Sequence, residues 1–280
     1  MFAKAAKEGK RDLYRTLKIF GRIDREYEYH TAWGYTDKGI KLYTDAYKFV
    51  PIEKPKRSYK EILTARKSVI ENDEPRETFA AVDYSMLPIS WLCEIAQEGF
   101  DAIVELGAGY GRALIEIYFQ GGPSRARYIG AEFTRSGREL MSEFLKLAPA
   151  LSFKTAFFDH NRPDLSFLGK KTKRVLIFTH HSIEQVKTLP DNFFSVLAAA
   201  APRVVGVHFE PFGFQLAPES AMSKAHAEFV ARKYYNSNFL SALKAAEERK
   251  TLRIRHLAAN VINPQGENPT SVAVWESGGT

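Results

Sequence analysis

Two adjacent histidines, His180 and His181, are the side chains in this sequence best suited to moving a proton. They stand in the stretch LIFTHHSIEQV, and the chain has only seven histidines in 280 residues. A neutral imidazole accepts a proton near neutral pH, and a carboxylate beside it can orient the ring. Glu184 follows one turn after the pair. The stretch therefore predicts a general base at His181 or His180, oriented by Glu184.

A second group of residues is suited to holding a ligand, because an acidic residue precedes glycines at alternate positions in VELGAGYG. Glycines between a strand and a helix let backbone N–H groups approach whatever lies across the strand end. The spacing G-x-G-x-G places Arg112 where a dinucleotide-binding loop has its third glycine, and no G-K-S or G-K-T follows as in a P-loop. Glu105 would repel a pyrophosphate but suits an ammonium or sulfonium cation. The loop residues expected at such a ligand are Gly107, Ala108, Gly109 and Gly111.

Short apolar runs surround these residues and are typical of strands covered by helices on both faces. The expected strands are 102–106, 126–132, 153–158, 174–178 and 204–209. Helical patterns fall between them at 111–118, 136–147 and 183–200, the last one broken or restarted at Pro190. Alternating strands and helices predict a parallel sheet. Ligands bind at the carboxyl ends of its strands, where Glu105 and the histidine pair stand.

The pattern changes after Pro211. Residues 220–250 indicate one or two helices interrupted at YYNSNF, and the runs 252–262 and 270–276 flank the turn-rich NPQGENP. These two runs predict an antiparallel hairpin at the edge of the sheet. The expected fold class is α/β, a Rossmann-like doubly wound sheet that is mostly parallel, with a C-terminal antiparallel hairpin. Residues 1–72 form an N-terminal extension with helical periodicity, and residues 73–280 form the main domain.

With an acidic residue and G-x-G-x-G after the first strand of the sheet, the sequence resembles the class I S-adenosylmethionine-dependent methyltransferases. The resemblance covers about residues 75–280 and implies S-adenosyl-L-methionine as the cofactor. It places Glu132, at the end of the second strand, at the ribose hydroxyls, and Asp159, after the third strand, near the adenine amine. His160 and Thr179 are expected beside the cofactor as well. For Asp159 the alternative is a turn formed with His160 and Asn161.

The segments THHSIEQ, EP and NPTSVAVW loosely resemble bacterial sugar O-methyltransferases. That resemblance implies a small molecule or a sugar as the methyl acceptor, with a hydroxyl whose proton needs a base. We prefer His181 as the base and place His180 nearer the cofactor. Other residues expected at the substrate end the fifth strand or interrupt the C-terminal helices: His208, Glu210, Tyr235, Asn236 and Asn238. No metal site is predicted, because neither H-x-x-x-H nor C-x-x-C spacing occurs.

Two other functions stay open: N-methylation of an RNA or a peptide, and a noncatalytic binding module of the same fold. Residues 1–72 hold 17 Lys and Arg against 10 Asp and Glu, so the whole net charge of +7 lies there. Nucleic acid is therefore a candidate partner, though not the favoured one. THHS is not the Asp/Asn-Pro-Pro-aromatic motif of adenine methyltransferases. Cys93 precedes the glycine loop, where it could not attack a pyrimidine.

The composition favours some classes of protein and argues against others. Hydrophobic residues make up 45% of the chain, enough for a large core. A single cysteine excludes a disulfide framework and fits a reducing cytoplasm. The longest apolar run, 193–201, is far shorter than the roughly 20 residues of a membrane span, and the first residues lack the apolar stretch of a secretory signal. We expect a cytoplasmic protein without a membrane span, and the oligomeric state is left open.

Overall fold

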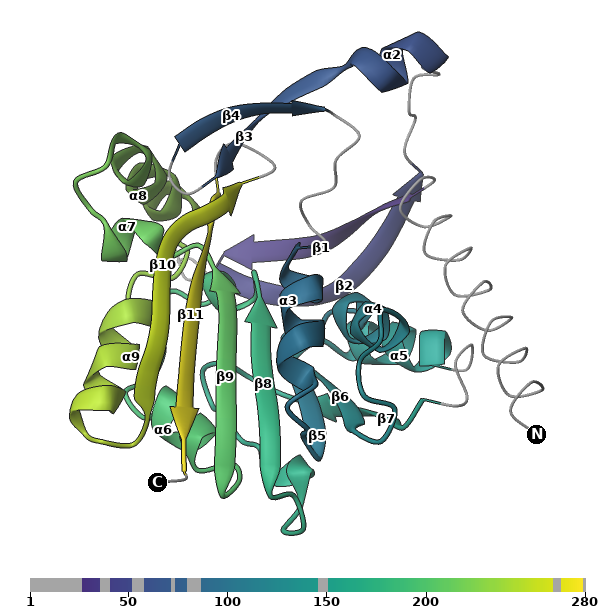
Figure 1. The fold of residues 1–280 in the computed structure, drawn as a ribbon, viewed down its shortest axis with the longest axis vertical. Helices are drawn as coiled ribbons and strands as arrows, with labels where there is room; N and C mark the ends of the chain where they lie inside the picture. Colours follow the sequence, from purple (N-terminus) through teal and green to yellow (C-terminus); the bar gives the residue numbers. More distant parts are fainter. Residues whose placement is uncertain are drawn as a thin grey trace.

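Five parallel strands form the middle of the computed structural model, which describes residues 27–35, 41–51, 58–71, 74–79, 87–145, 151–263 and 268–278. The strands are β5 (Ala102–Leu106), β6 (Arg127–Glu132), β7 (Phe153–Phe157), β8 (Arg174–His180) and β9 (Arg203–Glu210). β5 lies between β6 and β8, with β7 and β9 outside them. Every residue of β5 is buried, as its unbroken apolar pattern predicts. The mostly parallel α/β fold is confirmed (Figure 1).

An antiparallel part continues the sheet beyond β9. It contains β11 (Thr270–Ser277), β10 (Arg253–Asn263), β3 (Arg66–Glu71) and β4 (Glu74–Phe79), which gives the order β4-β3-β10-β11-β9-β8-β5-β6-β7. The prediction that the C-terminal hairpin forms the sheet edge is wrong, because Ile262 and Asn263 of β10 pair with Glu71 and Ile70 of β3. The outer edge of β10 offers unpaired backbone groups, and a further strand satisfies part of them.

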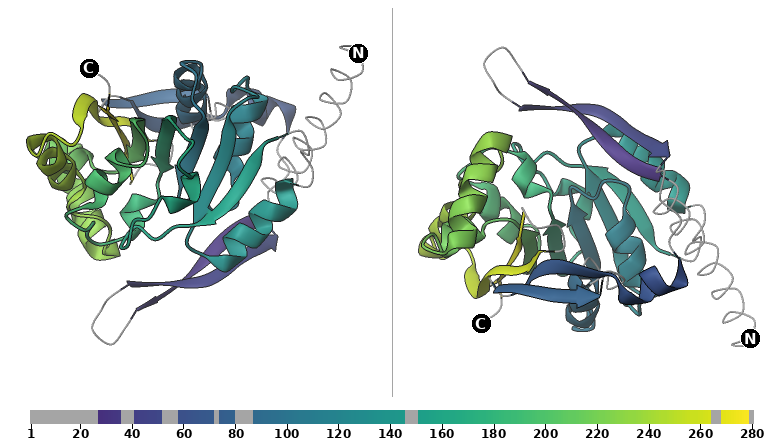
Figure 2. Two further views of the ribbon diagram at one scale, coloured as in Figure 1. Left: turned by 90° about the horizontal axis from the view of Figure 1, so that it is seen from below. Right: turned by 90° about the horizontal axis from the view of Figure 1, so that it is seen from above.

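Helices cover both faces of this sheet (Figure 2). On one face lie α6 (Phe193–Ala198) and α9 (Phe239–Glu248), and on the other lie α3 (Leu87–Ala96), α4 (Arg112–Phe119) and α5 (Arg135–Leu145). Side chains alternate along β8, so Val175 and Ile177 pack toward α6 whereas Leu176 and Phe178 pack toward α3. Neighbouring residues at a strand end therefore belong to different faces.

The described part of residues 1–72 is mainly strand, where the sequence predicts a basic, aromatic-rich extension or cap with helical periodicity only at its two ends. The periodicity at Ile62 and Leu63 is confirmed, because both lie in a helix. β1 (Tyr27–Tyr35) and β2 (Lys41–Pro51) form a separate antiparallel ribbon that lies along α5 (Figure 2), and α2 (Tyr59–Thr64) precedes β3. The alternating aromatic residues of YEYHTAWGY favour a strand. The periodic residues Leu13, Leu17 and Phe20 lie outside the described residues. The hairpin β3–β4 spans residue 72, and the division of the chain there stays a prediction.

The helix expected over 183–200 is wrong before Pro190, whereas the break at Pro190 is confirmed, because α6 begins after it. A 3-10 turn, Ile183–Gln185, is followed by an irregular segment and then by α6. Glu210 accepts from the N–H groups of Ser182, Ile183 and Glu184, the groups that the start of a helix leaves unpaired. The turn ends because Val186 is extended, with φ −109° and ψ 129°. The break within 220–250 is confirmed, since α8 (Ala221–Lys233) ends before α9 begins. None of the helices described is long and apolar enough to cross a membrane.

Candidate functional site

The glycine loop joins β5 to α4 at the carboxyl edge of the parallel strands. Gly107, Gly109 and Gly111 have φ values of 75°, 56° and 81°, a region that favours glycine. A Cβ on Gly107 would lie 2.4 Å from the Cβ of Ser182, so the loop also needs glycine for close approach. The N–H of Gly107 donates to the carbonyl of Ala131 at 2.7 Å. The loop therefore lies directly over the end of β6.

Glu132 ends β6 and ties the loop to it. Its Oε2 accepts from the N–H of Gly109 at 2.9 Å, and its Oε1 accepts from the N–H and hydroxyl of Thr134 at 2.8 and 2.7 Å. Burial raises the pKa of Glu132, although these hydrogen bonds and Arg138 act in the opposite direction. Gly137 of α5 lets these groups meet, since a Cβ there would lie 2.9 Å from the carbonyl oxygen of Gly109. The carboxylate is thus held beside the loop in one orientation.

Glu105 is the residue at this edge whose charge is least compensated. Its side chain is buried, and its Oε2 has no hydrogen-bond partner among the described residues, although the carboxylate accepts one hydrogen bond from the backbone N–H of Leu114. Burial raises the pKa of Glu105 well above its usual value, and the negative charges of Glu132 and Glu116 raise it further. A buried carboxylate without a cation is costly. The surroundings of Glu105 therefore favour a ligand with a positive charge.

The two histidines at the end of β8 have different surroundings. The ring of His180 lies on the α3 face, edge-on to Phe209 at 6.1 Å between centroids. Burial lowers the pKa of His180 to about 3, and the neighbouring charges of His181 and Arg112 contribute to that shift. His180 is therefore a neutral imidazole throughout the physiological pH range.

His181 forms a hydrogen-bonded pair with a carboxylate. It has a left-handed φ of 50°, its Nδ1 lies 3.1 Å from Glu184 Oε2, and its Nε2 lies 2.7 Å from Thr270 Oγ1. Because an ionised carboxylate only accepts, Nδ1 carries the proton and Nε2 is the basic atom of the neutral ring. Burial lowers the pKa of His181, but the charge and hydrogen bond of Glu184 and the charge of Glu210 outweigh it, so the pKa is raised. The predicted pairing of His181 with Glu184 is present.

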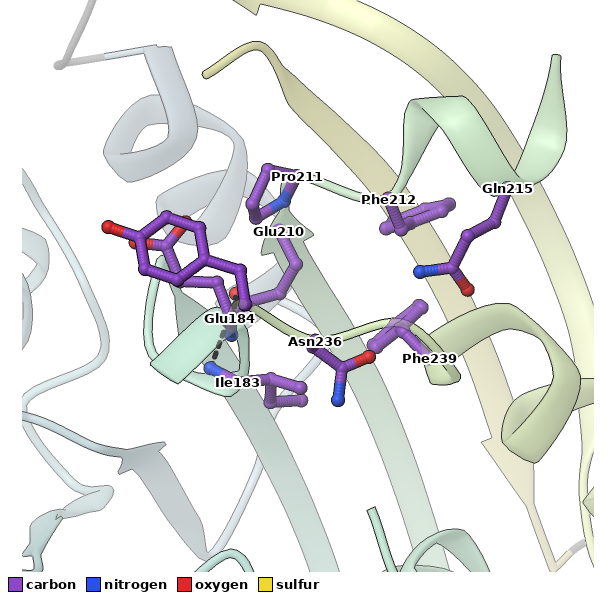
Figure 3. Close-up of a pocket in the computed structure, with 9 residues that line it drawn as sticks. Ile183, Glu184, Glu210, Pro211, Phe212, Gln215, Asn236 and Phe239 are labelled. Atoms are coloured by element: carbon purple, nitrogen blue, oxygen red, sulfur yellow. Dashed lines mark hydrogen bonds between the residues drawn. The ribbon is translucent and has the colours of Figure 1, made fainter. Parts of the chain in front are cut away.

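Glu210 ends β9 and holds the turn that carries Glu184. Its Oε1 accepts from the N–H groups of Ser182 and Ile183 at 3.0 and 3.1 Å, and its Oε2 accepts from that of Glu184 at 3.2 Å (Figure 3). Burial raises the pKa of Glu210 to about 7, with His181 lowering it and Glu184 raising it. The side chain thus holds the backbone of the 3-10 turn, and its contact with substrate stays a prediction.

A small pocket lies beside this turn (Figure 3). Its cavity of about 10 Å³ is the size of a single water molecule. It is lined by Ile183, Glu184, Glu210, Pro211, Phe212, Gln215, Tyr235, Asn236 and Phe239. Tyr235 thus lies near the turn, and its contact with substrate stays a prediction, because this pocket is too small for an acceptor molecule.

Thr179 and His208 do not face the carboxyl edge as the sequence suggests. Both are fully buried on the α6 face, where Thr179 Oγ1 lies 2.9 Å from His208 Nδ1. Trp275 Nε1 donates to His208 Nε2 at 2.9 Å. Because indole only donates, His208 carries its proton on Nδ1 and donates it to Thr179. The strand alternation turns these side chains into the core, and their contacts with cofactor and substrate stay predictions.

Asn236 and Asn238 hold the irregular segment after the 3-10 turn. Asn236 Nδ2 donates to the carbonyl of Val186 at 3.0 Å, and Asn238 both accepts from the N–H of Leu189 and donates to its carbonyl, at 2.8 and 2.9 Å. These bonds replace the helical bonds missing from residues 186–192. Both asparagines thus have a structural role, and their contact with substrate stays a prediction.

Asp159 and His160 follow β7 under the glycine loop. Asp159 Oδ1 accepts from the N–H of Asn161 at 2.8 Å, which is the turn given above as the alternative. His160 is buried, and neither ring nitrogen has a partner among the described residues. Burial lowers the pKa of His160 to about 4. A Cβ on Gly107 would lie 3.2 Å from His160 Nε2, so the ring borders the loop. The cofactor roles of Asp159 and His160 stay predictions, and Ala108 packs into the core on the α3 face.

Two polar residues of the site, Asn268 and Thr270, were not found from the sequence. They stand in and after the turn between β10 and β11, whereas their partners Glu184 and His181 lie 84 and 89 residues earlier. A turn-rich segment such as NPQGENP gives no signal that it contacts a distant strand end. Within the described ranges, no three His, Cys, Asp or Glu side chains gather as a metal ion would require.

No protein-family model and no curated protein matches the sequence. Solved structures with similarity include magnesium protoporphyrin IX methyltransferase from Synechocystis PCC 6803, with 15% identity, a TM-score of 0.45, and coverage of 68% of this chain and 80% of that one. The O-methyltransferase TomG from Streptomyces achromogenes has 15% identity, a TM-score of 0.44, and coverage of 72% and 83%. A SAM-dependent methyltransferase from Aquifex aeolicus has 11% identity, a TM-score of 0.43, and coverage of 69% and 93%. Since these TM-scores lie below 0.5, function is inferred from the residues of this chain.

Proposed function

We propose that the protein is an S-adenosylmethionine-dependent methyltransferase. The observation that carries the proposal is Glu105, whose buried Oε2 lacks a partner among the described residues at the edge where the glycine loop begins. A pyrophosphate or another anion at this place would add to the repulsion between Glu105 and Glu132. A ligand with an ammonium and a sulfonium group would relieve it. S-adenosylmethionine carries both cations on a nucleoside.

The residues around the loop fit that cofactor in shape as well as charge. The turn tolerates only glycine at two positions, since a Cβ on Gly107 would meet Ser182 and a Cβ on Gly111 would meet Met141, so no side chain projects from either position. The carboxylate of Glu132 stands one strand away, held by Gly109 and Thr134, and would accept from ribose hydroxyls. When bound, the cofactor supplies an electrophilic methyl group. The protein must then align an acceptor and remove its proton.

His181 supports an acceptor that has to lose a proton, such as a hydroxyl of a small molecule or a sugar. Its Nε2 is the basic atom, and Glu184 stabilises the imidazolium formed when that atom takes a proton. A raised pKa keeps it an effective base near neutral pH. His180 stays neutral on the opposite face of β8, where it would contact the bound cofactor. The pair thus divides into a base, His181, and a neutral neighbour, His180.

Calorimetry of the full chain with S-adenosylmethionine and S-adenosylhomocysteine tests the proposal. We expect both ligands to bind. S-adenosylhomocysteine should have the lower affinity, because its sulfur is uncharged and cannot offset the negative charge of Glu105. Glu132→Ala should weaken both ligands, because it removes the acceptor for the ribose hydroxyls. Absence of heat from either ligand would refute the proposed function.

Release of S-adenosylhomocysteine in the presence of phenols, sugars and small peptides tests the acceptor class. Hydroxyl acceptors should respond to His181→Ala with a loss of roughly 10²- to 10⁴-fold in turnover, with cofactor affinity preserved. Glu184→Gln should give a smaller loss in the same direction. Turnover with amines alone, unaffected by His181→Ala, would favour the N-methyltransferase instead.

A further inference from the structure

The turn between β10 and β11 places two polar side chains against the His181–Glu184 pair. Asn268 Nδ2 donates to Glu184 Oε2 at 2.7 Å, and Thr270 Oγ1 lies 2.7 Å from His181 Nε2. Asn268 also lies 3.4 Å from His181 Nδ1, so the two residues approach the imidazole from its two nitrogen sides. Thr270 is buried, and Glu184 is buried with it. One short stretch of the hairpin thus contacts both members of the pair.

The direction of these hydrogen bonds follows from the partners. Glu184 only accepts, so the amide nitrogen of Asn268 must face it and the amide oxygen must face His226. His226 lies on α8, is buried, and has its Nε2 3.0 Å from Asn268 Oδ1. His226 therefore donates from Nε2 to Asn268, and Asn268 donates to Glu184. Rotating the amide by 180° would lose both bonds, so Asn268 is held in one orientation.

Thr270 contacts the nitrogen that the proposed reaction uses. A hydroxyl is both donor and acceptor, so Thr270 can donate to Nε2 of the neutral ring and accept from Nε2 of the imidazolium after rotation of its O–H bond. Glu184 holds the opposite nitrogen in both states. The ring is thus restrained at both ends without changing which nitrogen is basic.

We propose that Asn268 and Thr270 are positioning residues for the base: Asn268 holds Glu184 on Nδ1 of His181, and Thr270 holds the ring at Nε2. This inference rests on the proposed function and extends it to the C-terminal hairpin. The hairpin then has two roles: it contributes strands to the sheet, and it supplies hydrogen-bond partners to His181 and Glu184. Asn268 acts only through Glu184, whereas Thr270 contacts Nε2, the atom that takes the proton.

The charged and titratable groups that face His181 come from four elements. Glu184 lies on the 3-10 turn and Glu210 at the end of β9, and both favour the imidazolium. His180, its neighbour on β8, and His226 on α8 would oppose it when charged. Asn268 is neutral, so its replacement by aspartate adds one negative charge to these groups around His181.

The test is an NMR titration of the histidine rings in the full-length protein labelled with ¹⁵N-histidine, for wild type and Asn268→Asp. A carboxylate within about 4 Å of Nδ1 should raise the pKa of His181 by about one unit or more. The matched control is Asn192→Asp, an exposed asparagine at the start of α6, which should leave that pKa unchanged. An unchanged pKa of His181 in Asn268→Asp would overturn the proposal.

Three further variants, none of which adds a charge, keep the test independent of any rearrangement that the aspartate causes. Neutral wild-type His181 should be the Nδ1–H tautomer, and Asn268→Ala should lower the fraction of that tautomer. Thr270→Val should move the Nε2 resonance toward that of a nitrogen without a donor, whereas Thr270→Ser should restore it. An Nε2–H tautomer in wild type, or identical spectra for Val and Ser, would contradict the roles assigned. These spectra need neither cofactor nor acceptor, so their outcome is separate from that of the calorimetry.

Discussion

Two buried carboxylates at the same edge of the sheet, Glu210 and Glu105, have opposite surroundings. Glu210 accepts three backbone N–H groups of the turn after β8, whereas Glu105 Oε2 has no partner among the described residues. Burial raises the pKa of both. A buried carboxylate with its hydrogen bonds made holds the structure together, while one without them costs stability until a ligand supplies the missing interaction. The difference separates a structural region, β8 to β9, from a binding region, β5 to β6.

The largest effect is expected at the glycine loop of the binding region. Gly107→Ala combines a left-handed backbone with a Cβ 2.4 Å from Ser182, and should lower the free energy of unfolding by about 3 kcal/mol or more. Gly99→Ala is the matched control, because Gly99 has a φ of 83° and an added Cβ would meet only the flexible end of Arg174, at 3.9 Å. Urea unfolding of the two variants measures the contribution of close approach alone. Equal losses would mean that the loop is not tightly packed on Ser182.

The next largest effect is expected for Glu210→Gln, which should lower the free energy of unfolding. The amide oxygen can accept, but its NH₂ group would face N–H donors of the turn, so the free energy of unfolding should fall by about 1–3 kcal/mol. Urea unfolding measures this at pH 8, where wild-type Glu210 is ionised. A variant as stable as wild type would remove the contrast between Glu210 and Glu105.

Glu105→Gln should give the opposite result, weaker cofactor binding without loss of stability. Loss of the carboxylate charge should weaken the binding of S-adenosylmethionine by about ten- to a hundredfold, as measured by calorimetry. The folded pKa of Glu105 is raised, so the folded state keeps a proton that the unfolded chain has released, and wild-type stability falls as the pH rises above 4.5. The stability of Glu105→Gln should fall less than that of wild type as the pH rises above 4.5. Glu98→Gln, an exposed glutamate at the opposite edge, should change neither quantity.

The smallest expected effect is on the pH dependence of stability, which should change differently when His180 and when His181 is replaced. The pKa of His181 is raised in the fold, so its contribution to stability is complete below pH 6.5 and is lost as the pH rises through the folded value. The pKa of His180 is lowered to about 3, so its contribution is present above pH 6.5 and is lost as the pH falls toward 3. Urea midpoints across pH should therefore change on the alkaline side for His181→Asn and on the acid side for His180→Asn. The same pH profile for both variants would contradict their opposite surroundings.

Much of the binding region could be predicted from the sequence. The run AIVEL, the glycines after it and Glu132 at the end of the next strand are each signalled by neighbouring residues, and β5 and the loop lie where expected. The pairing of His181 with Glu184 was also predicted, because only three residues separate them. Such features depend on contacts between residues close in the chain or on adjacent parallel strands.

The structural region could be predicted only in part. Thr179 and His208 carry polar groups at strand ends, but alternation and Trp275 turn them into the core. Glu210 stands at a strand end too, yet its oxygens are used by the turn that replaced the expected helix. Polar side chains at the end of a strand have the same sequence signal whether they face a ligand or satisfy the backbone.

The sequence by itself determined the α/β class, the parallel strands and the acidic glycine loop, because local periodicity and glycine placement follow from contacts along the chain. Only the tertiary structure decided that β3 pairs with β10 and that Asn268 and Thr270 reach His181 and Glu184. It also decided which buried carboxylate lacks partners. Hydrogen bonds between residues more than 80 positions apart depend on how strands and turns are packed, and no local pattern records that packing.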